Sequence, residues 1–355
     1  MEVERIEKIE SSIENLKNKK ARIYFLVQDT KGNAKASIAH TYEMANVLYK
    51  NNYNVIIIHE TQEYTGVSEW LGGEYMLIPH ESIEGRNLTI SPEDFIIIPE
   101  LYGHVMDQLK NFPCGKIVLC QAYDYMLETL APGVTWQQYG FAKVITTSEE
   151  QKTLVKEIMR NASVDVIEPV LSEKFTKKEK PSKPIISIHT RETRDTAKII
   201  KSFYLKYPQF RWITFRDMRG ITQEDFAKFL KDSFVSVWVD DVSGFGTFPL
   251  ESMASGTPVI GKVPNLKPGW MEESNGIWTY QINEIIDILA NYTQNWLEDN
   301  ISPELYEKML ETSQKFQDTK KYEESIITTF NDYFDVRTKL FSDQIDKLKI
   351  SEEQN

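Results

Sequence analysis

Short apolar runs alternate with helical stretches along the first half of the chain. Residues 22–27 and 55–58 are apolar, and between them lie a polar loop over 28–35 and a helical stretch over 36–50. This order is typical of a βαβ unit. Further apolar runs follow at 95–99, 116–119 and 143–146, the last before a helical stretch over 149–160. Such continuous apolar runs predict a parallel sheet covered on both faces.

A segment without periodicity interrupts this alternation at 173–184. It carries two prolines and a cluster of lysines, which predicts a linker. We interpret the lysines as a solvated loop and keep a local basic groove as the alternative; they are Lys177, Lys178, Lys180 and Lys183. The alternation then resumes, with strands predicted at 184–188, 210–214, 234–239 and 258–260, and helices at 195–207, 223–230 and 248–255.

The pattern predicts two doubly wound, Rossmann-like α/β domains that face a central cleft. A chain of 355 residues suits two domains better than one. In such sheets a ligand binds outside the carboxyl ends of the strands. We place the first domain at 21–172, the linker at 173–184 and the second domain at 185–318. From about 282 onward the pattern is helical, and we expect 319–355 to form a helix that crosses back onto the first domain and ends in a frayed tail.

Residues 1–20 form a predicted amphipathic helix. Ile6, Ile9, Ile13 and Leu16 recur at spacings of three and four, with charges between them. The apolar face could pack on the body of the protein or make a coiled-coil contact with a partner, so that oligomerisation through this helix is open. We favour packing on the body.

Composition narrows the class of protein. The net charge of −12 argues against a broad nucleic-acid-binding surface, although it leaves a local one open. The two cysteines, Cys114 and Cys120, offer neither a disulfide framework nor a zinc motif, which favours a reducing cytoplasm. No apolar run reaches the ~18 residues of a membrane span. The N-terminus is charged from its second residue, and we expect no secretory signal there.

The clearest chemistry lies in DDVSGFGTFPLESMASGTPVIG, residues 240–261. Gly244 and Gly246 flank Phe245, so that the backbone can approach a ligand closely and offer N–H donors. A helix that begins near Phe248 would direct its N-terminal amides to the same cleft, where they favour an anion. Glu251, in its first turn, could accept hydrogen bonds from a sugar diol. A plain helix with a buried turn is the structural alternative.

Basic side chains follow the first strand of the second domain. Arg191, Arg194 and Lys198 lie where a strand leads into a helix. They could neutralise a diphosphate, and the planar fork of arginine matches phosphate oxygens. A surface ion-pair network with Glu192 and Asp195 is the alternative.

The string GFGTFPLESMASGTPVIG resembles the donor-binding motif of retaining GT-B glycosyltransferases of the GT4 type, E-G-F-G-x-x-x-x-E-A-M-A-x-G-x-P-V-I. The resemblance implies that Glu251 is the second glutamate, which holds the ribose of a nucleotide-sugar donor. Ser243 stands where the family has its first glutamate, near the donor sugar. The implied donor-binding residues are Arg191, Arg194, Lys198, Gly244, Phe245, Gly246, Thr247 and Glu251.

The resemblance also implies that the first domain supplies the acceptor site. Gly32 and Asn33 lie where the family has a glycine-bearing loop. Gln121 and Tyr123 follow a later predicted strand and should lie at the same edge of the sheet. Ser148 and Gln151 follow the next strand, but they fit helix capping better than ligand contact.

The candidate catalytic residues are Glu100, His104 and Ser243. Glu100 and His104 follow the fully apolar run 95–99, so both should emerge at the cleft. Glu100 could bind a hydroxyl or act as a base, whereas His104 fits an ordinary loop histidine equally well.

If the resemblance holds, the chain is a hexosyl- or pentosyltransferase that retains anomeric configuration and uses UDP or a similar nucleotide. Fixed positive charge and helix-end amides would stabilise the leaving group without a metal. We expect no bound cofactor, because no G-x-G-x-x-G follows the first strand and the histidines share no metal spacing. The sequence does not identify the acceptor, which could be a glycan, a small molecule or DNA with hydroxylated bases. A nucleotide-sugar-binding protein without catalysis is a further alternative, motivated by Ser243.

Overall fold

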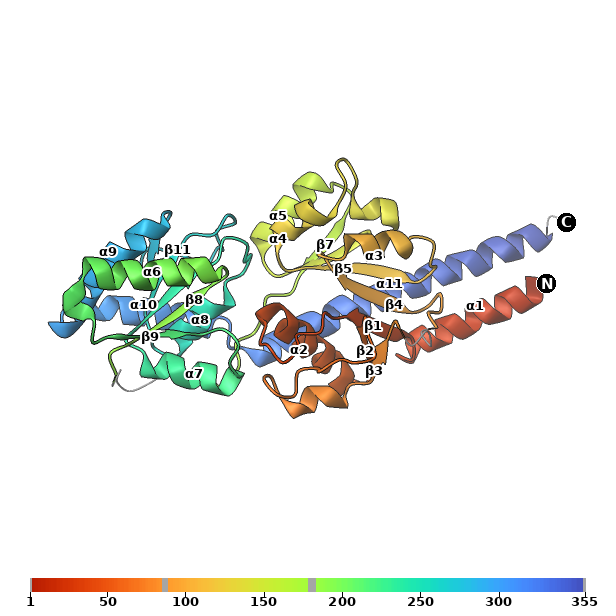
Figure 1. Cartoon of the computed structure of the whole chain (residues 1–355). Coiled ribbons are helices and arrows are strands. Elements are labelled where there is room, and N and C mark those ends of the chain that lie inside the picture. Colours follow the sequence, from red (N-terminus) through yellow and green to blue (C-terminus); the bar gives the residue numbers. More distant parts are fainter. Residues whose placement is uncertain (1, 85–88, 178–182, 354–355) are drawn as a thin grey trace.

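The computed structural model describes residues 2–84, 89–177 and 183–353, which fold around two parallel sheets (Figure 1). Residues 178–182 of the predicted linker, with Lys178 and Lys180, lie outside the described residues, as do residues 354–355 of the predicted tail. Two parallel sheets of this kind confirm the predicted fold class of two Rossmann-like units.

The first sheet contains seven parallel strands among the described residues, in the order β3-β2-β1-β4-β5-β6-β7. The direction of strand order reverses between β1 and β4, which is the switch point at which doubly wound sheets bind ligands. The strands are β1 (Arg22–Leu26), β2 (Asn54–His59), β3 (His80–Ser82), β4 (Phe95–Pro99), β5 (Gly115–Cys120), β6 (Lys143–Thr146) and β7 (Ser163–Val166).

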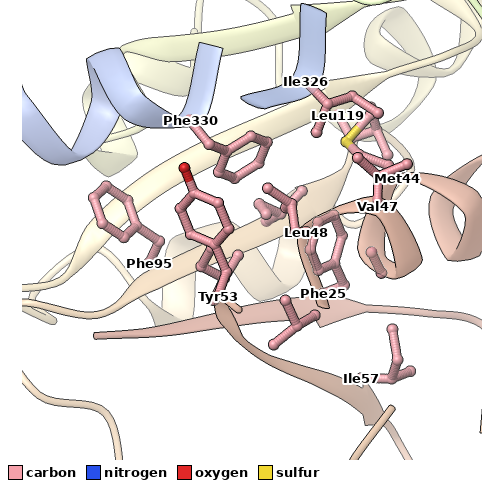
Figure 2. Close-up of a cluster of buried hydrophobic side chains, with 14 of the residues drawn as sticks. Phe25, Met44, Val47, Leu48, Tyr53, Ile57, Phe95, Leu119, Ile326 and Phe330 are labelled. Carbon is pink, nitrogen blue, oxygen red and sulfur yellow. The ribbon is translucent and has the colours of Figure 1, made fainter. Parts of the chain in front are cut away.

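Helices cover both faces of this sheet, which explains its continuous apolar strands. Along β1, Ile23 and Phe25 enter one core and Tyr24 and Leu26 enter the other, because successive side chains point to opposite faces. Figure 2 shows Phe25 packed with residues of the helices on its face. The helices between the strands are α2 (Ala36–Lys50), α3 (Gly103–Gln108), α4 (Tyr123–Thr129) and α5 (Glu149–Ile158), with 3₁₀ turns η1 (Gly73–Leu77) and η2 (Trp136–Tyr139).

The second sheet has five parallel strands in the described part of the chain, in the order β12-β11-β10-β8-β9. Its switch point lies between β8 and β10. The strands are β8 (Ile185–Thr190), β9 (Thr214–Asp217), β10 (Val235–Val239), β11 (Val259–Lys262) and β12 (Ile277–Thr279). One face packs on α6 (Thr193–Lys206) and α9 (Ile282–Leu297), and the other on α7 (Gln223–Asp232), α8 (Thr247–Ala254) and α10 (Pro303–Gln314).

The C-terminal helix α11 (Thr319–Glu353) returns from the second sheet to the first. Ile326, Phe330 and Tyr333 of α11 are fully buried in the core that contains Phe25. Figure 2 shows Ile326 and Phe330 in this core. The N-terminal helix α1 (Glu2–Lys17) packs along α11, and both ends of the chain lie at the same end of the molecule (Figure 1). Leu16 enters the same core, which confirms packing of this helix on the body. Oligomerisation through it stays a prediction.

The structure corrects the sequence reading of one strand. The strand expected at 210–214 lies instead at β9, and Pro208–Phe210 forms the 3₁₀ turn η3. The apolar side chain of Phe210 is buried against Phe203 of α6, with ring centroids 5.9 Å apart. This packing, and not membership of a strand, accounts for an apolar residue at this position. Cys114 and Cys120 are free and buried. Within the residues that the structure describes, no helix has the length and apolar character that crossing a membrane requires.

Candidate functional site

Arg191 and Asp240 form the centre of the candidate site. They follow β8 and β10, which are neighbours in the second sheet, so both side chains emerge at the same carboxyl edge. Arg191 Nε donates to Asp240 Oδ1 over 2.7 Å, and Nη2 donates to Oδ2 over 3.2 Å. This two-point geometry fixes the plane of the guanidinium. The ion-pair partner of Arg191 is therefore Asp240, rather than the Glu192 or Asp195 of the alternative reading.

Asp240 also shapes the glycine loop that follows it. Its Oδ1 accepts from the backbone N–H of Val242 over 3.0 Å and of Ser243 over 3.1 Å. Ser243 Oγ in turn accepts from the N–H of Gly246 over 3.1 Å. Among the hydrogen bonds of the described residues, none uses the N–H of Gly244 or Phe245. Both residues are buried, and within the described part of the chain these two amides are left without a partner.

Position 246 requires a glycine, both for its backbone conformation and because Trp270 lies close to it. Its φ is +78°, and an added Cβ would lie 2.9 Å from Cζ2 of Trp270. Trp270 Nε1 donates to the carbonyl of Phe245 over 2.7 Å, while the Phe245 ring is buried in the core against Phe316. Phe245 can therefore offer a ligand its backbone but not its ring. Helix α8 starts at Thr247, directly after this turn.

These loops of the second domain face α4 and α5 of the first. Arg191 Nη1 donates to the hydroxyl of Tyr125 over 2.7 Å, and Asn265 Nδ2 donates to Asp124 over 2.9 Å. A guanidinium has five N–H donors, and the three bonds above leave two free. The Arg191 side chain retains 35% of its exposure.

Gln151 of α5 seats the glycine loop against the first domain. A Cβ added at Gly244 would lie 1.7 Å from Gln151 Nε2, so no larger residue fits there without movement. Gln151 is fully buried. Its Oε1 accepts from the backbone N–H of Thr147 over 3.0 Å and from the Thr147 hydroxyl over 2.8 Å. Its Nε2 donates to the carbonyl of Gln121 over 2.8 Å. Ser148 caps α5 through the N–H of Gln151 over 3.2 Å, which confirms the predicted cap.

Glu100 supports the turn after β5. It is buried, and its two oxygens accept from the N–H of Ala122 over 2.8 Å and of Gln121 over 3.2 Å. Burial raises the pKa of Glu100 to about 7, and these backbone donors oppose that rise. His104 is exposed on α3 and contacts the ring of Tyr102, with centroids 6.0 Å apart. Glu100 therefore does not emerge at the cleft as expected, because its two oxygens are buried against the turn after β5, whereas His104 is exposed.

The acceptor-side candidates occupy the same edge of the first sheet. Gly32 has a φ of +78°, and the next residue, Asn33, lies opposite Gly220 of the second domain, where an added Cβ would be 3.5 Å from Asn33 Oδ1. Gln121 Nε2 donates to the Ser37 carbonyl over 3.1 Å. Tyr123 is half-buried against the core beneath α3 and α4.

The two other basic candidates lie on α6. Arg194 and Lys198 are exposed, and neither takes part in an ion pair within the described chain. Both side chains could contact an anion. Unlike Arg191, neither of them is held to the glycine loop by an ion pair with Asp240.

Glu251 faces a carboxylate of the other domain. It lies on α8 and is half-buried, and burial together with the nearby Glu43 of α2 raises its pKa well above its usual range. Burial raises the pKa of Glu43 to about 8. Two carboxyls from different domains therefore favour their protonated forms here. Sequence reasoning missed Glu43, because a single acid inside a helix carries no local signal.

His189 of β8 lies beneath this site. Its ring stacks on Phe248 with centroids 5.0 Å apart, and burial lowers its pKa to about 4, so it is neutral. In the described part of the chain its Nδ1 has no hydrogen-bond partner. The same described residues contain no group of three or more His, Cys, Asp or Glu side chains that could hold a metal ion.

Comparisons with known proteins bear on the fold of the chain. No family model matches the sequence. Over 219 residues the chain is 25% identical to an alpha-1,6-glucosyltransferase of Actinobacillus pleuropneumoniae serotype 7. The match spans 60% of this chain and 64% of that protein, so the chain covers less than two thirds of its relative.

Solved GT-B glycosyltransferases have similar structures. The pneumococcal O-GlcNAc transferase GtfA, in complex with UDP and GlcNAc, has a TM-score of 0.62 at 10% identity, over 89% of this chain and 99% of its own. Sucrose-phosphate synthase of Thermosynechococcus elongatus has a TM-score of 0.60 at 12% identity, over 89% and 100%. Anabaena HepE, in complex with UDP-glucose, has a TM-score of 0.58 at 12% identity, over 88% and 99%. The chain has the GT-B fold.

Proposed function

We propose that this protein is a glycosyltransferase that moves a sugar from a nucleotide-sugar donor to an acceptor hydroxyl, in the manner of GT4-type enzymes. One observation carries the proposal. Asp240 joins the guanidinium of Arg191 to the glycine loop at the switch point of the second sheet, opposite α4 and α5 of the first domain. This is the place where doubly wound sheets bind nucleotides.

The donor we propose is a UDP-sugar. GtfA and HepE are described as complexes with UDP or UDP-glucose. In this chain the amides of Gly244 and Phe245 and the two remaining donors of Arg191 would bind the diphosphate. Arg194 and Lys198 are further cations for it, and Glu251 would accept hydrogen bonds from the ribose.

In the proposed reaction the acceptor oxygen forms a bond to the anomeric carbon of the sugar. The bond from that carbon to the diphosphate oxygen breaks, the acceptor hydroxyl loses its proton, and the nucleoside diphosphate leaves with the electron pair. Negative charge therefore grows on the diphosphate, where Arg191 and the loop amides stabilise it. We propose that the reaction retains anomeric configuration, requires neither a metal nor a cofactor, and transfers a hexose or a pentose.

The first domain would bind the acceptor through the loop at Gly32 and Asn33 and through Gln121. We propose that Glu100 acts on the acceptor side by ordering the turn at Gln121, since both of its oxygens are bonded to that turn. The buried thiols of Cys114 and Cys120 support a reducing compartment such as the cytoplasm.

A nucleotide-sugar-binding protein without catalysis is the second candidate. Ser243 takes the position of the first motif glutamate, and its hydroxyl oxygen is bonded to Gly246 within the loop. A carboxylate near the donor sugar is thereby replaced by a side chain that closes a turn.

A thermal-shift screen against nucleotide sugars tests both candidates, because a true donor stabilises the folded state by mass action. The donor that raises the melting temperature is then incubated with the protein, and nucleotide release is measured with and without EDTA. Stabilisation with release supports the transferase, and the anomeric coupling constant of the product in NMR reports retention. Stabilisation without release, with any acceptor offered, supports the binding protein. If no nucleotide sugar stabilises the chain, both candidates are wrong.

A further inference from the structure

A cavity of about 380 Å³ lies between α1 and α11. These ends of the two helices lie on the side of the first sheet remote from the second (Figure 1). Three basic residues line the cavity, Arg5 and Lys8 from α1 and Arg337 from α11, and no acidic residue is among its lining residues. Its apolar wall includes Ile9, Leu340 and Phe341. The cavity is therefore positively charged on one part of its surface and apolar on another.

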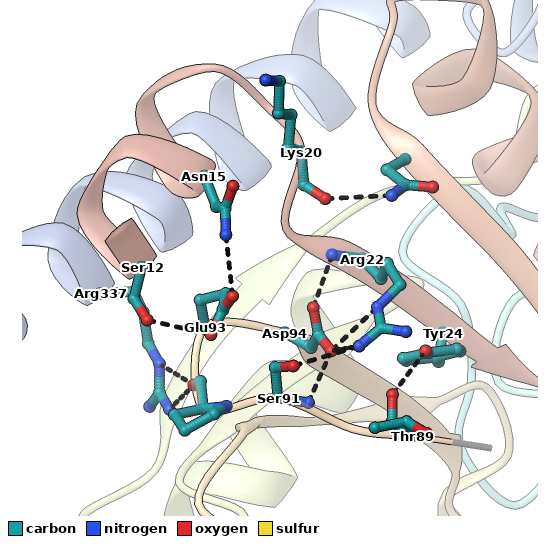
Figure 3. A network of polar contacts seen from close by, with 12 residues as sticks. Ser12, Asn15, Lys20, Arg22, Tyr24, Thr89, Ser91, Glu93, Asp94 and Arg337 are labelled. Carbon is teal, nitrogen blue, oxygen red and sulfur yellow. Dashed lines mark hydrogen bonds and ion pairs between the residues drawn. The ribbon is translucent and has the colours of Figure 1, made fainter. Parts of the chain in front are cut away.

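Arg337 is the most informative of these residues. Its guanidinium is half-buried and donates to the carbonyl of Pro92 from Nε over 3.1 Å and from Nη2, and to the carbonyl of Pro113 from Nη2. Figure 3 shows Arg337 near Ser12 and Glu93. Within the described residues the guanidinium forms no ion pair with a carboxylate, and no hydrogen bond uses Nη1. Burial lowers the pKa of Arg337, as expected for a cation whose charge is incompletely compensated.

Two carboxylates lie close enough to act on this charge, and both are bonded elsewhere. Asp94 accepts from the guanidinium of Arg22 over 2.7 Å (Figure 3). Glu93 accepts from Ser12 Oγ over 3.1 Å and from Asn15 Nδ2 over 3.0 Å. The free N–H donors at Nη1 therefore remain for an anion that enters from outside.

We propose that this cavity binds a phosphate ester that carries an apolar group. The planar fork of Arg337 suits phosphate oxygens. Arg5 adds a cation on the opposite helix, and so does Lys8, whose exposed side chain also pairs with Glu4 over 3.4 Å. Leu340, which is 50% exposed, and the buried Phe341 offer apolar contact for the substituent. The ester can come from a soluble metabolite or from the headgroup of a lipid. This site is separate from Arg191 and the glycine loop, and it does not depend on the proposed transferase function.

Hexyl phosphate is a soluble probe of this chemistry, and calorimetric titration measures its binding to the full chain. The double variant R5Q/K8Q removes two cations on the exposed helix α1 and leaves the Arg337 contacts with the body intact. We expect it to bind hexyl phosphate at least about tenfold more weakly than the wild type. The matched control K17Q/K20Q makes the same charge change outside the cavity and should bind like the wild type.

Two further probes identify the part of the ligand that is recognised. Hexanol should not bind, and inorganic phosphate should bind more weakly than hexyl phosphate, with the difference reduced in Leu340→Ala. Sedimentation with phosphatidylglycerol vesicles, compared with phosphatidylcholine vesicles, distinguishes the sources. If the chain sediments with the anionic vesicles and R5Q/K8Q does not, the ester is a lipid headgroup. If the chain binds hexyl phosphate but not the vesicles, the ester is a soluble compound. No binding of hexyl phosphate, or an equal loss in both double variants, would overturn the proposal.

Discussion

The guanidinium of Arg191 and the carboxylate of Asp240 meet through two hydrogen bonds, of 2.7 and 3.2 Å, across the neighbouring ends of β8 and β10. The same carboxylate accepts the N–H groups of Val242 and Ser243, so that one acidic side chain fixes both the cation and the glycine loop. The position of the proposed diphosphate site therefore depends on a residue that would not itself bind the anion.

Asp240→Asn tests this dependence. The amide has one oxygen, which at the Oδ1 position keeps Arg191 Nε and the loop N–H groups but places the NH2 group against Arg191 Nη2, so the guanidinium loses its two-point contact. We expect the affinity for UDP to fall about tenfold, which corresponds to about 1.4 kcal/mol. Titration calorimetry measures this effect, with Asp241→Asn as the control, because Asp241 pairs with Lys262 instead. Equal UDP affinities of the two variants would contradict the role given to Asp240.

Glu251→Ala tests the ribose contact. Because Glu251 favours its protonated form, its removal should weaken UDP binding by about 0.5–1.5 kcal/mol for each hydrogen bond to the ribose, the usual range between uncharged groups. Glu311→Ala, at an exposed position on α10 where the carboxylate pairs with Lys308, is the control and should bind UDP normally. Unchanged affinity of Glu251→Ala would mean that the motif has been misread.

Glu43 gives the stability a predictable dependence on pH. Burial raises its pKa from 4.5 to about 8 in the folded chain, with Glu251, Tyr75 and Tyr322 around it. Between these pH values the folded chain binds more protons than the unfolded chain, so this group makes the free energy of unfolding fall as the pH rises. Urea denaturation from about pH 5 to about pH 8 should therefore show a smaller fall for Glu43→Gln than for the wild type. Parallel curves would contradict the shifted pKa.

Gly244→Ala tests the contact between the two domains at the donor loop. The new methyl group would meet Gln151 Nε2 at 1.7 Å, so that the loop and α5 must move apart. We expect a lower melting temperature and weaker UDP binding. If the clash is the cause, Gln151→Ala should partly restore Gly244→Ala, with a coupling energy on the order of 1 kcal/mol in a double-mutant cycle. Additive losses would show that Gly244 is required for another reason.

The sequence predicted those parts of the fold in which local pattern and burial agree. Phe95–Pro99 is buried at every position and was readable as a central strand. The short edge strands His80–Ser82 and Ile277–Thr279 were missed, because they contain three residues each and are partly exposed. Pairing with β2 and β11, rather than their own composition, makes them strands.

The candidate site likewise contains residues that a local sequence pattern indicates and residues that only the folded chain brings into place. The glycine loop and Arg191 were predicted as donor-binding because their residue types suit a phosphate, and they stay a prediction. The function of Asp240 was not predicted, because it depends on β8 and β10 being neighbours, which places residues 49 positions apart in contact. Gln151 was correctly predicted as part of a helix cap, but its contact with Gly244 arises only when the two domains meet.

The most direct test of the central claim is the contribution of each phosphate to binding, measured by calorimetric titration of uridine, UMP and UDP. Arg191→Lys keeps the positive charge but loses the planar fork. If Arg191 and the glycine loop converge on a diphosphate, the wild type and the control Arg211→Lys will prefer UDP to UMP by about tenfold, and Arg191→Lys will lose that preference. An Arg191→Lys variant that keeps the full preference for UDP over UMP would contradict the account.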